Sequence, residues 1–300
     1  MKVAITLAGG SQGSALARAL IGRGHQVRAL VRNSSSPAAR DLAACRADLA
    51  LAPFDDAQAL RAALTNVDGL FSVQMAPAPA APDSERSQAR ALAAAAREAG
   101  VSRVVHSSVS HAGSIDQMPE WETDLWDRNY WTSKRDAEDM FRVAGFEALT
   151  ILRPAFMMEN FIAPKSSWMF PDLPAGELRT AIDPDVRLVL VAADDIAAMA
   201  AAALENPSSF AGKAIELAGD LKTLPEVAGI IARVSGRPVR AVAVSPEQLV
   251  ERGLSSGWIR TQLWMNRVNY PARPDEMALA GISPTRFADW AARHAADFMA

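Results

Sequence analysis

The chain has 300 residues, half of them hydrophobic, with a formal net charge of −3 at pH 7 and a single cysteine, Cys45. This mildly acidic balance argues against nucleic acid as a partner, and no apolar run has the length of a membrane span. One cysteine excludes an internal disulfide. Since the N-terminus also lacks the pattern of a signal peptide, we expect a cytoplasmic protein.

Strand-like and helix-like segments alternate through the first half of the chain. Five apolar segments are predicted strands: residues 2–8, 26–32, 67–73, 102–110 and 148–154. Four segments between them are predicted helices, most of which end at a glycine: residues 14–24, 56–64, 83–100 and 128–145. This alternation predicts an α/β fold of the Rossmann type, with a doubly wound parallel sheet and helices on both faces.

The alternation weakens after Pro154. Residues 154–176 are rich in Pro, Met and aromatic residues, which is typical of a loop region that shapes a pocket. Residues 186–207 return to a strand followed by a helix, and later segments indicate further helices around a strand at 238–245. We predict a Rossmann domain of residues 1–153, to which 186–205 returns, and a smaller mixed α/β substrate-binding lobe of residues 154–185 and 206–300.

The segment LAGGSQG, residues 7–13, lies between the first predicted strand and the first predicted helix. Glycines there let a pyrophosphate approach the backbone N–H groups at the helix N-terminus. Gly9, Gly10 and Gly13 are therefore candidate cofactor residues, and the alternative is a tight turn that binds nothing. A Pro-rich loop at residues 76–82 follows a strand, where loops of open α/β sheets line the ligand crevice.

This turn resembles the GATGxQG turn of the NmrA-like group, an atypical branch of the short-chain dehydrogenase/reductase superfamily. Leu7 stands at the first glycine of that pattern, Gly9 at the threonine, and Gly10 and Gly13 at the other two glycines. Residues 25–33, 145–161 and 191–204 also resemble segments of the family.

The resemblance implies an NAD(P)-binding protein and further cofactor contacts. Its motifs add five positions to the cofactor site: Ser11, Gln12, Asp55, Pro154 and Phe156. Asp55 or the adjacent Asp56 stands in for an aspartate that the family commonly has near the adenine, where this chain has Pro53.

The end of the second predicted strand, LVRNSSS, bears on the choice between NAD and NADP. An acid at this position binds the ribose 2′-hydroxyl of NAD, whereas an arginine accommodates the 2′-phosphate of NADP. Arg32 occupies the position, Asn33 and Ser34 can donate hydrogen bonds, and no acidic residue occurs between Gln26 and Arg40. We therefore predict NADP(H) over NAD(H); the alternative for Arg32 is an ordinary solvated arginine.

Tyr130 and Lys134 form a YxxxK motif on a predicted helix, where this spacing places both on one face. A neighbouring ammonium stabilises a phenolate, and the tyrosine can then exchange a proton while hydride moves to or from a carbonyl carbon. Short-chain dehydrogenases use such a pair with a serine at the end of a strand; Ser108 is our choice and Ser107 the alternative. Alternatively, Tyr130 simply packs among neighbouring tryptophans.

Aromatic and methionine side chains near these motifs can wall an apolar pocket suited to a planar substrate. The candidates are Trp126, Trp131, Met158 and Phe161, together with Asn160, which the resemblance implies as a polar contact. Trp258 and Trp264 fit either a pocket or the core of the second lobe. The four histidines show no metal-ligand spacing, so we predict no metal.

We thus expect an NADP(H)-dependent oxidoreductase that transfers hydride to a small, apolar, conjugated carbonyl, quinone or enone. The alternative is a non-catalytic NADP(H) redox sensor that acts through a protein partner. A third reading, an isomerase or epimerase, needs tightly held NAD, which Arg32 argues against. Expected partners are a small-molecule substrate, with no nucleic acid and no membrane, and a homo-oligomer is left open.

Overall fold

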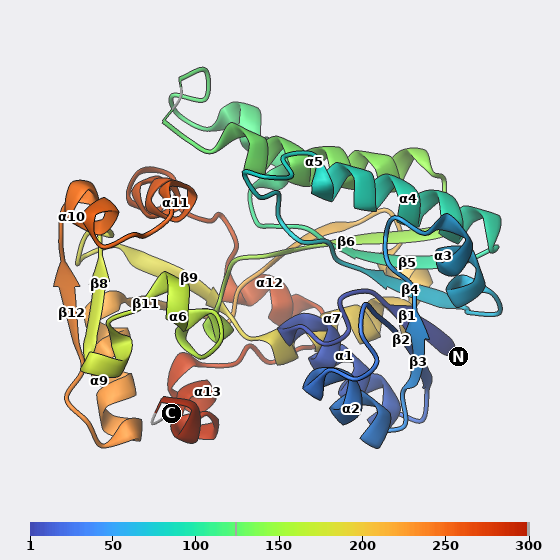
Figure 1. The fold of residues 1–300 in the computed structure, drawn as a ribbon, viewed down its shortest axis with the longest axis horizontal. Helices are drawn as coiled ribbons and strands as arrows, with labels where there is room; N and C mark the ends of the chain where they lie inside the picture. The colour runs from blue at the N-terminus through green and yellow to red at the C-terminus, as the bar shows by residue number, and fades with distance from the viewer. Residues whose placement is uncertain (124, 299–300) are drawn as a thin grey trace. The chain divides into compact units, whose positions relative to one another are not determined.

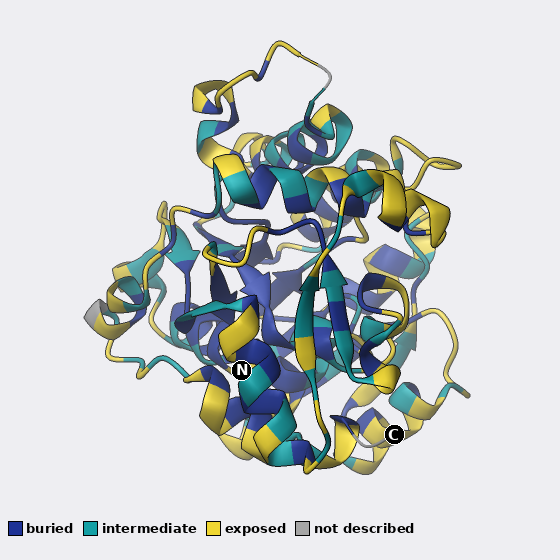
Figure 2. Cartoon of the chain, turned by 90° about the vertical axis from the view of Figure 1, so that its left-hand side faces the viewer, coloured by how far each residue is buried: buried dark blue, intermediate teal, exposed yellow. Residues whose placement is uncertain are grey.

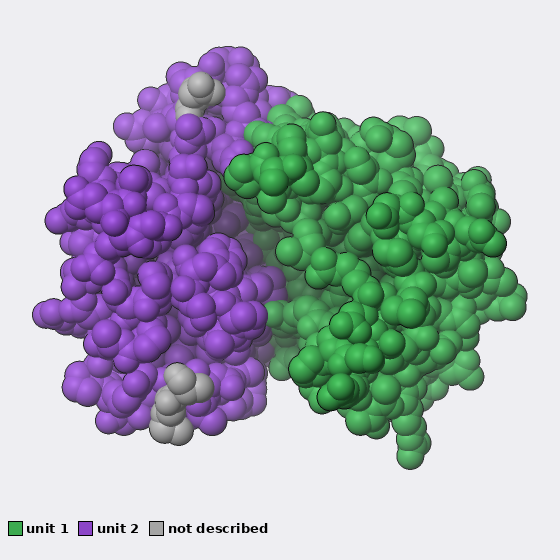
Figure 3. Space-filling model, in the orientation of Figure 1, with its two compact units in different colours: residues 1–113, 129–154, 193–216 green, residues 114–128, 155–192, 217–300 purple. Residues whose placement is uncertain are grey.

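The computed structural model describes residues 1–123 and 125–298, apart from the side chain of Leu279. Contacts divide the chain into two compact units, coloured separately in Figure 3. Unit 1 comprises Met1–Gly113, Asn129–Pro154 and Ala193–Glu216, and unit 2 comprises Ser114–Arg128, Ala155–Ala192 and Leu217–Ala300. Residues 114–128 and 186–192 thus group with unit 2, and residues 206–216 with unit 1, unlike in the predicted division.

A seven-stranded sheet forms the centre of unit 1 (Figure 1), in the order β10-β6-β5-β4-β1-β2-β3. Its strands are β1 (Lys2–Ile5), β2 (Gln26–Val31), β3 (Asp48–Leu51), β4 (Gly69–Ser72), β5 (Arg103–Ser107), β6 (Ala148–Pro154) and β10 (Ala214–Leu217). The pairings from β3 to β6 are all parallel. The chain order reverses between β1 and β4, where the loops that follow these strands open a ligand crevice in such sheets. The predicted Rossmann-type fold is confirmed.

The helices of unit 1 are α1 (Ser11–Gly22), α2 (Pro37–Ala44), α3 (Ala57–Leu64), α4 (Ser84–Glu98), α5 (Arg128–Val143), α7 (Ala193–Glu205) and α8 (Pro207–Phe210). Local sequence explains several of their ends. Asp56 caps α3 by accepting a hydrogen bond from Ala59 N at 2.9 Å, as short polar side chains do at helix N-termini. Gly24 and Gly100, with φ of +81° and +73°, follow the ends of α1 and α4.

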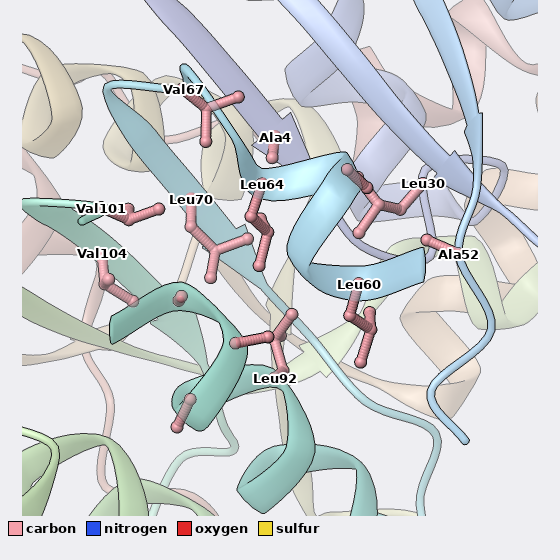
Figure 4. Close-up of a cluster of buried hydrophobic side chains, with 14 of the residues drawn as sticks. Ala4, Leu30, Ala52, Leu60, Leu64, Val67, Leu70, Leu92, Val101 and Val104 are labelled. Atoms are coloured by element: carbon pink, nitrogen blue, oxygen red, sulfur yellow. The ribbon is translucent and has the colours of Figure 1, made fainter. Parts of the chain in front are cut away.

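Apolar side chains of α3 and α4 pack on one face of the sheet (Figure 4). Leu60 and Leu64 of α3 and Leu92 of α4 are fully buried beside Leu70 of β4. Burial of one such side chain contributes about 1.5–3 kcal/mol. Buried residues gather along the strands and the helix faces that cover them (Figure 2), so the sheet is a rigid base for the loops at its strand ends.

Unit 2 holds two small sheets, in the orders β11-β9-β7 and β12-β8. Their strands are β7 (Phe156–Met157), β8 (Glu177–Thr180), β9 (Arg187–Val191), β11 (Asp220–Thr223) and β12 (Arg240–Ala243). The helices are α6 (Ser166–Met169), α9 (Leu224–Ser235), α10 (Pro246–Glu251), α11 (Ser256–Arg267), α12 (Pro274–Leu279) and α13 (Phe287–Arg293), with 3₁₀ turns η1 (Ala112–Gln117), η2 (Met158–Phe161), η3 (Leu173–Ala175) and η4 (Ala295–Phe298). In the part of the chain that the structure describes, none of the helices has the length and hydropathy of a membrane span.

Candidate cofactor and active site

The glycine turn joins β1 to α1 in unit 1. Leu7 adopts φ of +45°, a left-handed conformation that glycine adopts more easily, and its carbonyl accepts a hydrogen bond from Gly10 N at 2.8 Å. A Cβ on Gly13 would lie 2.6 Å from Leu7 O and 2.7 Å from Ala8 Cα. Only glycine at position 13 therefore lets the first turn of α1 lie this close to the loop.

Gln12 of α1 connects this turn to the end of β5. Ser107 Oγ donates a hydrogen bond to Gln12 Oε1 at 2.7 Å. Gly10, at the N-cap of α1, has no side chain with which to cap the helix. Backbone N–H groups at such a helix start are a binding site for a pyrophosphate.

A pocket of about 510 Å³ lies beside the glycine turn, over the ends of β1 and β2. Its lining combines the turn, the end of β2, the start of α2 and the loop after β3: Thr6, Leu7, Ala8, Gly9, Gly10, Leu30, Val31, Arg32, Asn33, Ser36, Ala39, Ala52, Phe54 and Met75. Within the described chain, none of these residues is acidic. The polar part of the lining thus carries a single charge, that of Arg32.

The loop between Arg32 and α2 is ordered by its own hydrogen bonds. Asn33 Oδ1 accepts from Ser35 N at 2.8 Å, and Ser36 Oγ donates to Asn33 O at 3.1 Å. Ser36 also caps α2. Ser36 was not predicted as a site residue, although a serine followed by proline at the first helical position is typical of a helix start.

The residues that line the pocket near the predicted adenine site are not all those that were predicted. Phe54 and Met75 line the pocket and were not predicted. Asp55, which was predicted, is exposed and is not part of the lining. Ser34 is likewise exposed, on the loop before α2.

Tyr130 and Lys134 lie one turn apart on α5, as their spacing predicts. Lys134 Nζ lies 5.8 Å from the centroid of the Tyr130 ring, on its face. Trp131 is buried and meets the Tyr130 ring edge-on at 5.2 Å. The motif is thus brought together, with the ammonium against the ring.

The ammonium of Lys134 has a partner that the sequence did not reveal. Lys134 Nζ donates to Glu85 Oε1 at 2.6 Å, and Ser133 Oγ donates to Glu85 Oε2 at 2.7 Å. Both charged side chains are buried, with 9% of Lys134 and 2% of Glu85 exposed. Glu85 belongs to α4, 49 residues away in the chain, so only the packing of two helices brings it here.

The two serines after β5 face different neighbours. Ser107 contacts Gln12 of the glycine turn. Ser108 donates its backbone N–H to Leu152 O at 2.8 Å. Its buried Oγ lies beside Glu138 of α5 and helps to lower the pKa of that carboxyl. Ser108 is therefore a buried polar group against α5.

Glu138 and Arg153 form a buried ion pair behind the YxxxK motif. Arg153 donates to the carboxylate at 2.9 Å from Nε and at 2.7 Å from Nη2. Burial opposes the charge of Glu138, but the hydrogen bonds and charge of Arg153 outweigh it and lower the pKa of this carboxyl. The pair joins α5 to β6 and holds the helix on the sheet.

His106 of β5 is excluded as a proton donor at neutral pH. The ring is fully buried, stacks on Phe141 at 4.6 Å and lies 3.2 Å from Ser72 Oγ. Burial is the largest cause that lowers the pKa of His106 to about 3. The imidazole is therefore neutral and structural. In residues 1–123 and 125–298, no three metal-ligating side chains converge.

The remaining predicted residues lie mostly in unit 2 and are largely buried there. Phe161 is fully buried and stacks on Phe170 at 5.0 Å, and Phe156 stacks on Trp258 at 5.8 Å. Met158 is also fully buried, and Trp126 donates from Nε1 to Pro119 O at 2.7 Å. These side chains support unit 2 from within, whereas Asn160 on η2 is half-buried. Trp258 and Trp264 are core residues, and Pro154 is buried at the end of β6.

The sheet order, the glycine turn and the pocket beside it define a Rossmann-type dinucleotide-binding fold. The chain belongs to the NmrA-like family, whose model matches residues 1–279.

Individual relatives cover nearly the whole chain. It is 29% identical to the NAD(P)H azoreductase of Xenophilus azovorans, over 96% of both chains. Its fold is similar to an NADPH-dependent quinone oxidoreductase of Escherichia coli, with 24% identity, a TM-score of 0.74 and coverage of 97% and 98%. It is also similar to NmrA, a negative transcriptional regulator solved with NADP, with 20% identity, a TM-score of 0.75 and coverage of 97% and 94%.

Proposed function

We propose that this protein is an NADP(H)-dependent reductase of small, apolar, conjugated carbonyl, quinone or enone compounds. The observation that carries the proposal is the pocket beside the glycine turn, with Arg32 as its charged residue and no acid in its described lining. An acid there would favour the ribose hydroxyl of NAD, whereas a guanidinium suits the 2′-phosphate of NADP.

The residues of unit 1 fit such a cofactor. Gly10 and Gly13 would lie under the pyrophosphate, because Gly10 leaves the first N–H groups of α1 without a side-chain cap and Gly13 lets α1 begin close to the turn. Arg32, Asn33 and Ser34 would hold the 2′-phosphate, with Phe54 and Met75 beside the adenine. Lys134 would hold the nicotinamide ribose. When bound, NADPH supplies the hydride.

Tyr130 is the proposed proton donor. Its phenol would give a proton to the substrate oxygen that gains negative charge as hydride adds to the substrate. Ser108, directly after β5, is the proposed polar contact for that atom, and Ser107 remains the alternative. The named relatives, an azoreductase and a quinone oxidoreductase, support conjugated acceptors as the substrate class.

Tyr130→Phe is expected to lower the rate of hydride transfer about 100-fold, because general-acid catalysis typically contributes 10²- to 10⁴-fold. NADPH affinity is expected to change less than about twofold. The measurement is the decay of bound NADPH fluorescence after addition of a panel of quinones, aldehydes and enones to the wild type and to the variant. Equal decay in the two proteins would contradict the role of Tyr130.

Arg32→Ala is expected to raise the Kd of NADPH about 10- to 100-fold and to leave the weaker binding of NADH nearly unchanged. The reason is the loss of charge-assisted hydrogen bonds to the 2′-phosphate, each worth about 1.5–3 kcal/mol. Fluorescence titration with both cofactors measures this. Arg23→Ala is the matched control, since Arg23 pairs with Glu205 beyond the far end of α1. An equal loss of affinity for NADPH and NADH would contradict the assignment of Arg32 to the 2′-phosphate.

A redox sensor is the second candidate, and the fold similarity to a transcriptional regulator solved with NADP favours it. Bound NADPH that persists with every acceptor would support the sensor over the reductase. Failure to bind either cofactor would reject both.

A further inference from the structure

Glu85 is a buried carboxylate for which the proposed chemistry has no use. Its two oxygens lie 2.6 Å from Lys134 Nζ and 2.7 Å from Ser133 Oγ, and only 2% of its side chain is exposed. A buried ion pair is weak support for stability, since its desolvation offsets its attraction. Stability alone therefore does not explain why a carboxylate is buried beside the lysine of the YxxxK motif.

The backbone that carries Glu85 is held in place independently of Lys134, through contacts of the next residue, Arg86. Arg86 donates from Nε to Asp136 at 2.7 Å, from Nη1 to Asn129 at 2.8 Å and from Nη2 to Thr132 at 2.8 Å. These three contacts fix the first turn of α4 against the first turns of α5. Glu85 thus stands at a set place against the ammonium before any ligand arrives.

The pair also has a consequence for charge. A buried lysine ammonium without a partner gives its surroundings a full positive charge. The ammonium of Lys134 lies 2.6 Å from the Glu85 carboxylate, so the pair as a whole has almost no net charge. Arg86 is likewise neutralised, by Asp136. The nicotinamide ring is cationic in the oxidised cofactor and neutral in the reduced one, so it experiences the net charge of its surroundings only when oxidised.

We propose that Glu85 is the counter-ion of Lys134 and that it sets the relative affinity of the site for oxidised and reduced cofactor. This inference rests on the proposed function, in which Lys134 meets the nicotinamide ribose. With Glu85 ionised, the oxidised ring is not repelled. Without that charge, the ammonium acts alone and disfavours NADP⁺ relative to NADPH. Glu85 is thus a positioning residue and touches neither cofactor nor substrate.

Glu85→Gln is the direct test, since the amide keeps the shape and one acceptor oxygen but removes the charge. The Kd of NADPH is measured by fluorescence titration, and that of NADP⁺ by competition. The ratio of the NADP⁺ Kd to the NADPH Kd is expected to rise about tenfold. This is the order of magnitude for the repulsion between one uncompensated ammonium and the cationic nicotinamide ring in a partly buried site. Glu98→Gln is the matched control on the same helix, because Glu98 is exposed and pairs with Arg61 at the surface; its ratio is expected to equal that of the wild type.

The double variant Glu85→Gln with Lys134→Met separates charge from structure. It removes both charges, so the ratio is expected to return to the wild-type value even though activity is lost. If Glu85→Gln does not fold, Glu85→Asp replaces it, with a smaller rise in the same direction because the charge withdraws by one methylene.

The outcomes separate this inference from the proposed function. A single variant that weakens both cofactor forms equally gives Glu85 a structural role only and overturns the inference, while the reductase proposal stands. A double variant that keeps the raised ratio overturns it as well. Wild-type protein that binds neither form rejects the proposed function itself.

Discussion

Gly13→Ala is expected to raise the Kd of NADPH at least about 100-fold and to destabilise the fold by about 2–3 kcal/mol. The added methyl group would lie 2.6 Å from Leu7 O and 2.7 Å from Ala8 Cα, and both are backbone atoms that cannot rotate away. Overpacking of this kind typically costs about 1–3 kcal/mol. The start of α1 must shift from the turn, which moves the N–H groups proposed to hold the pyrophosphate. Fluorescence titration and urea unfolding measure the two effects.

Gly22→Ala is the matched control at the other end of the same helix. A Cβ on Gly22 meets no atom within 4 Å, and alanine is favoured over glycine in a helix by about 0.5–1 kcal/mol. The control is expected to bind NADPH normally and to unfold at slightly higher urea. If Gly13→Ala binds NADPH as well as this control does, the glycine turn is not the phosphate site.

Arg153→Met is expected to destabilise unit 1 by about 3–5 kcal/mol, because it leaves the fully buried carboxylate of Glu138 without its main partner. The matched control is Arg142→Met. Arg142 contacts the same carboxylate at 2.8 Å, but its side chain is 41% exposed, and exposed pairs contribute about 0–1 kcal/mol. Equal losses in the two variants would contradict the importance of the buried pair.

The loss of unfolding free energy caused by Arg153→Met is also expected to depend on pH. In the wild type the pKa of Glu138 is lowered in the fold from its ordinary 4.5. The stability it contributes is therefore complete above about pH 4.5 and is lost as the pH falls through the folded-state pKa. Without Arg153, burial raises the pKa and the fold favours the protonated form. The difference in unfolding free energy between the two proteins should narrow from pH 6 to pH 4, as followed by urea unfolding.

The sequence predicted those elements whose patterns are strong over several residues. The mainly apolar segments at 26–31 and 148–154 became β2 and β6, and glycines ended α1, α4 and α5 as expected. The segment at 34–51 was not assigned, although it contains α2 and β3. Its serines are polar, and β3 has only four residues, all partly exposed at the edge of the sheet. The apolar run at 49–52 is too short for its pattern to distinguish a strand from a helix or a loop.

The candidate site divides in the same way. The glycine turn, Arg32 and the YxxxK motif each lie within a few residues, so local spacing predicts them. Glu85 could not be predicted in this way, because its contact with Lys134 depends on the packing of α4 against α5. Phe54 and Met75 follow different strands, and only the fold of the sheet brings them to the same pocket. Such neighbours carry no signal in one sequence.

Unit 1 is built from three separate stretches of chain, and this affects how the protein is made. Helix α7, with nine of its 13 residues buried, packs against α1. Glu205 at its end pairs with Arg23 and His25. A ribosome that adds about 5–20 residues per second takes roughly 10–40 s to go from α1 to the end of α7. During that time the face of α1 that packs against α7 stays uncovered, so unit 1 cannot complete its packing until the last of its three stretches is made. For the same reason, a chain truncated after β6 would lack α7, the helix that packs against α1.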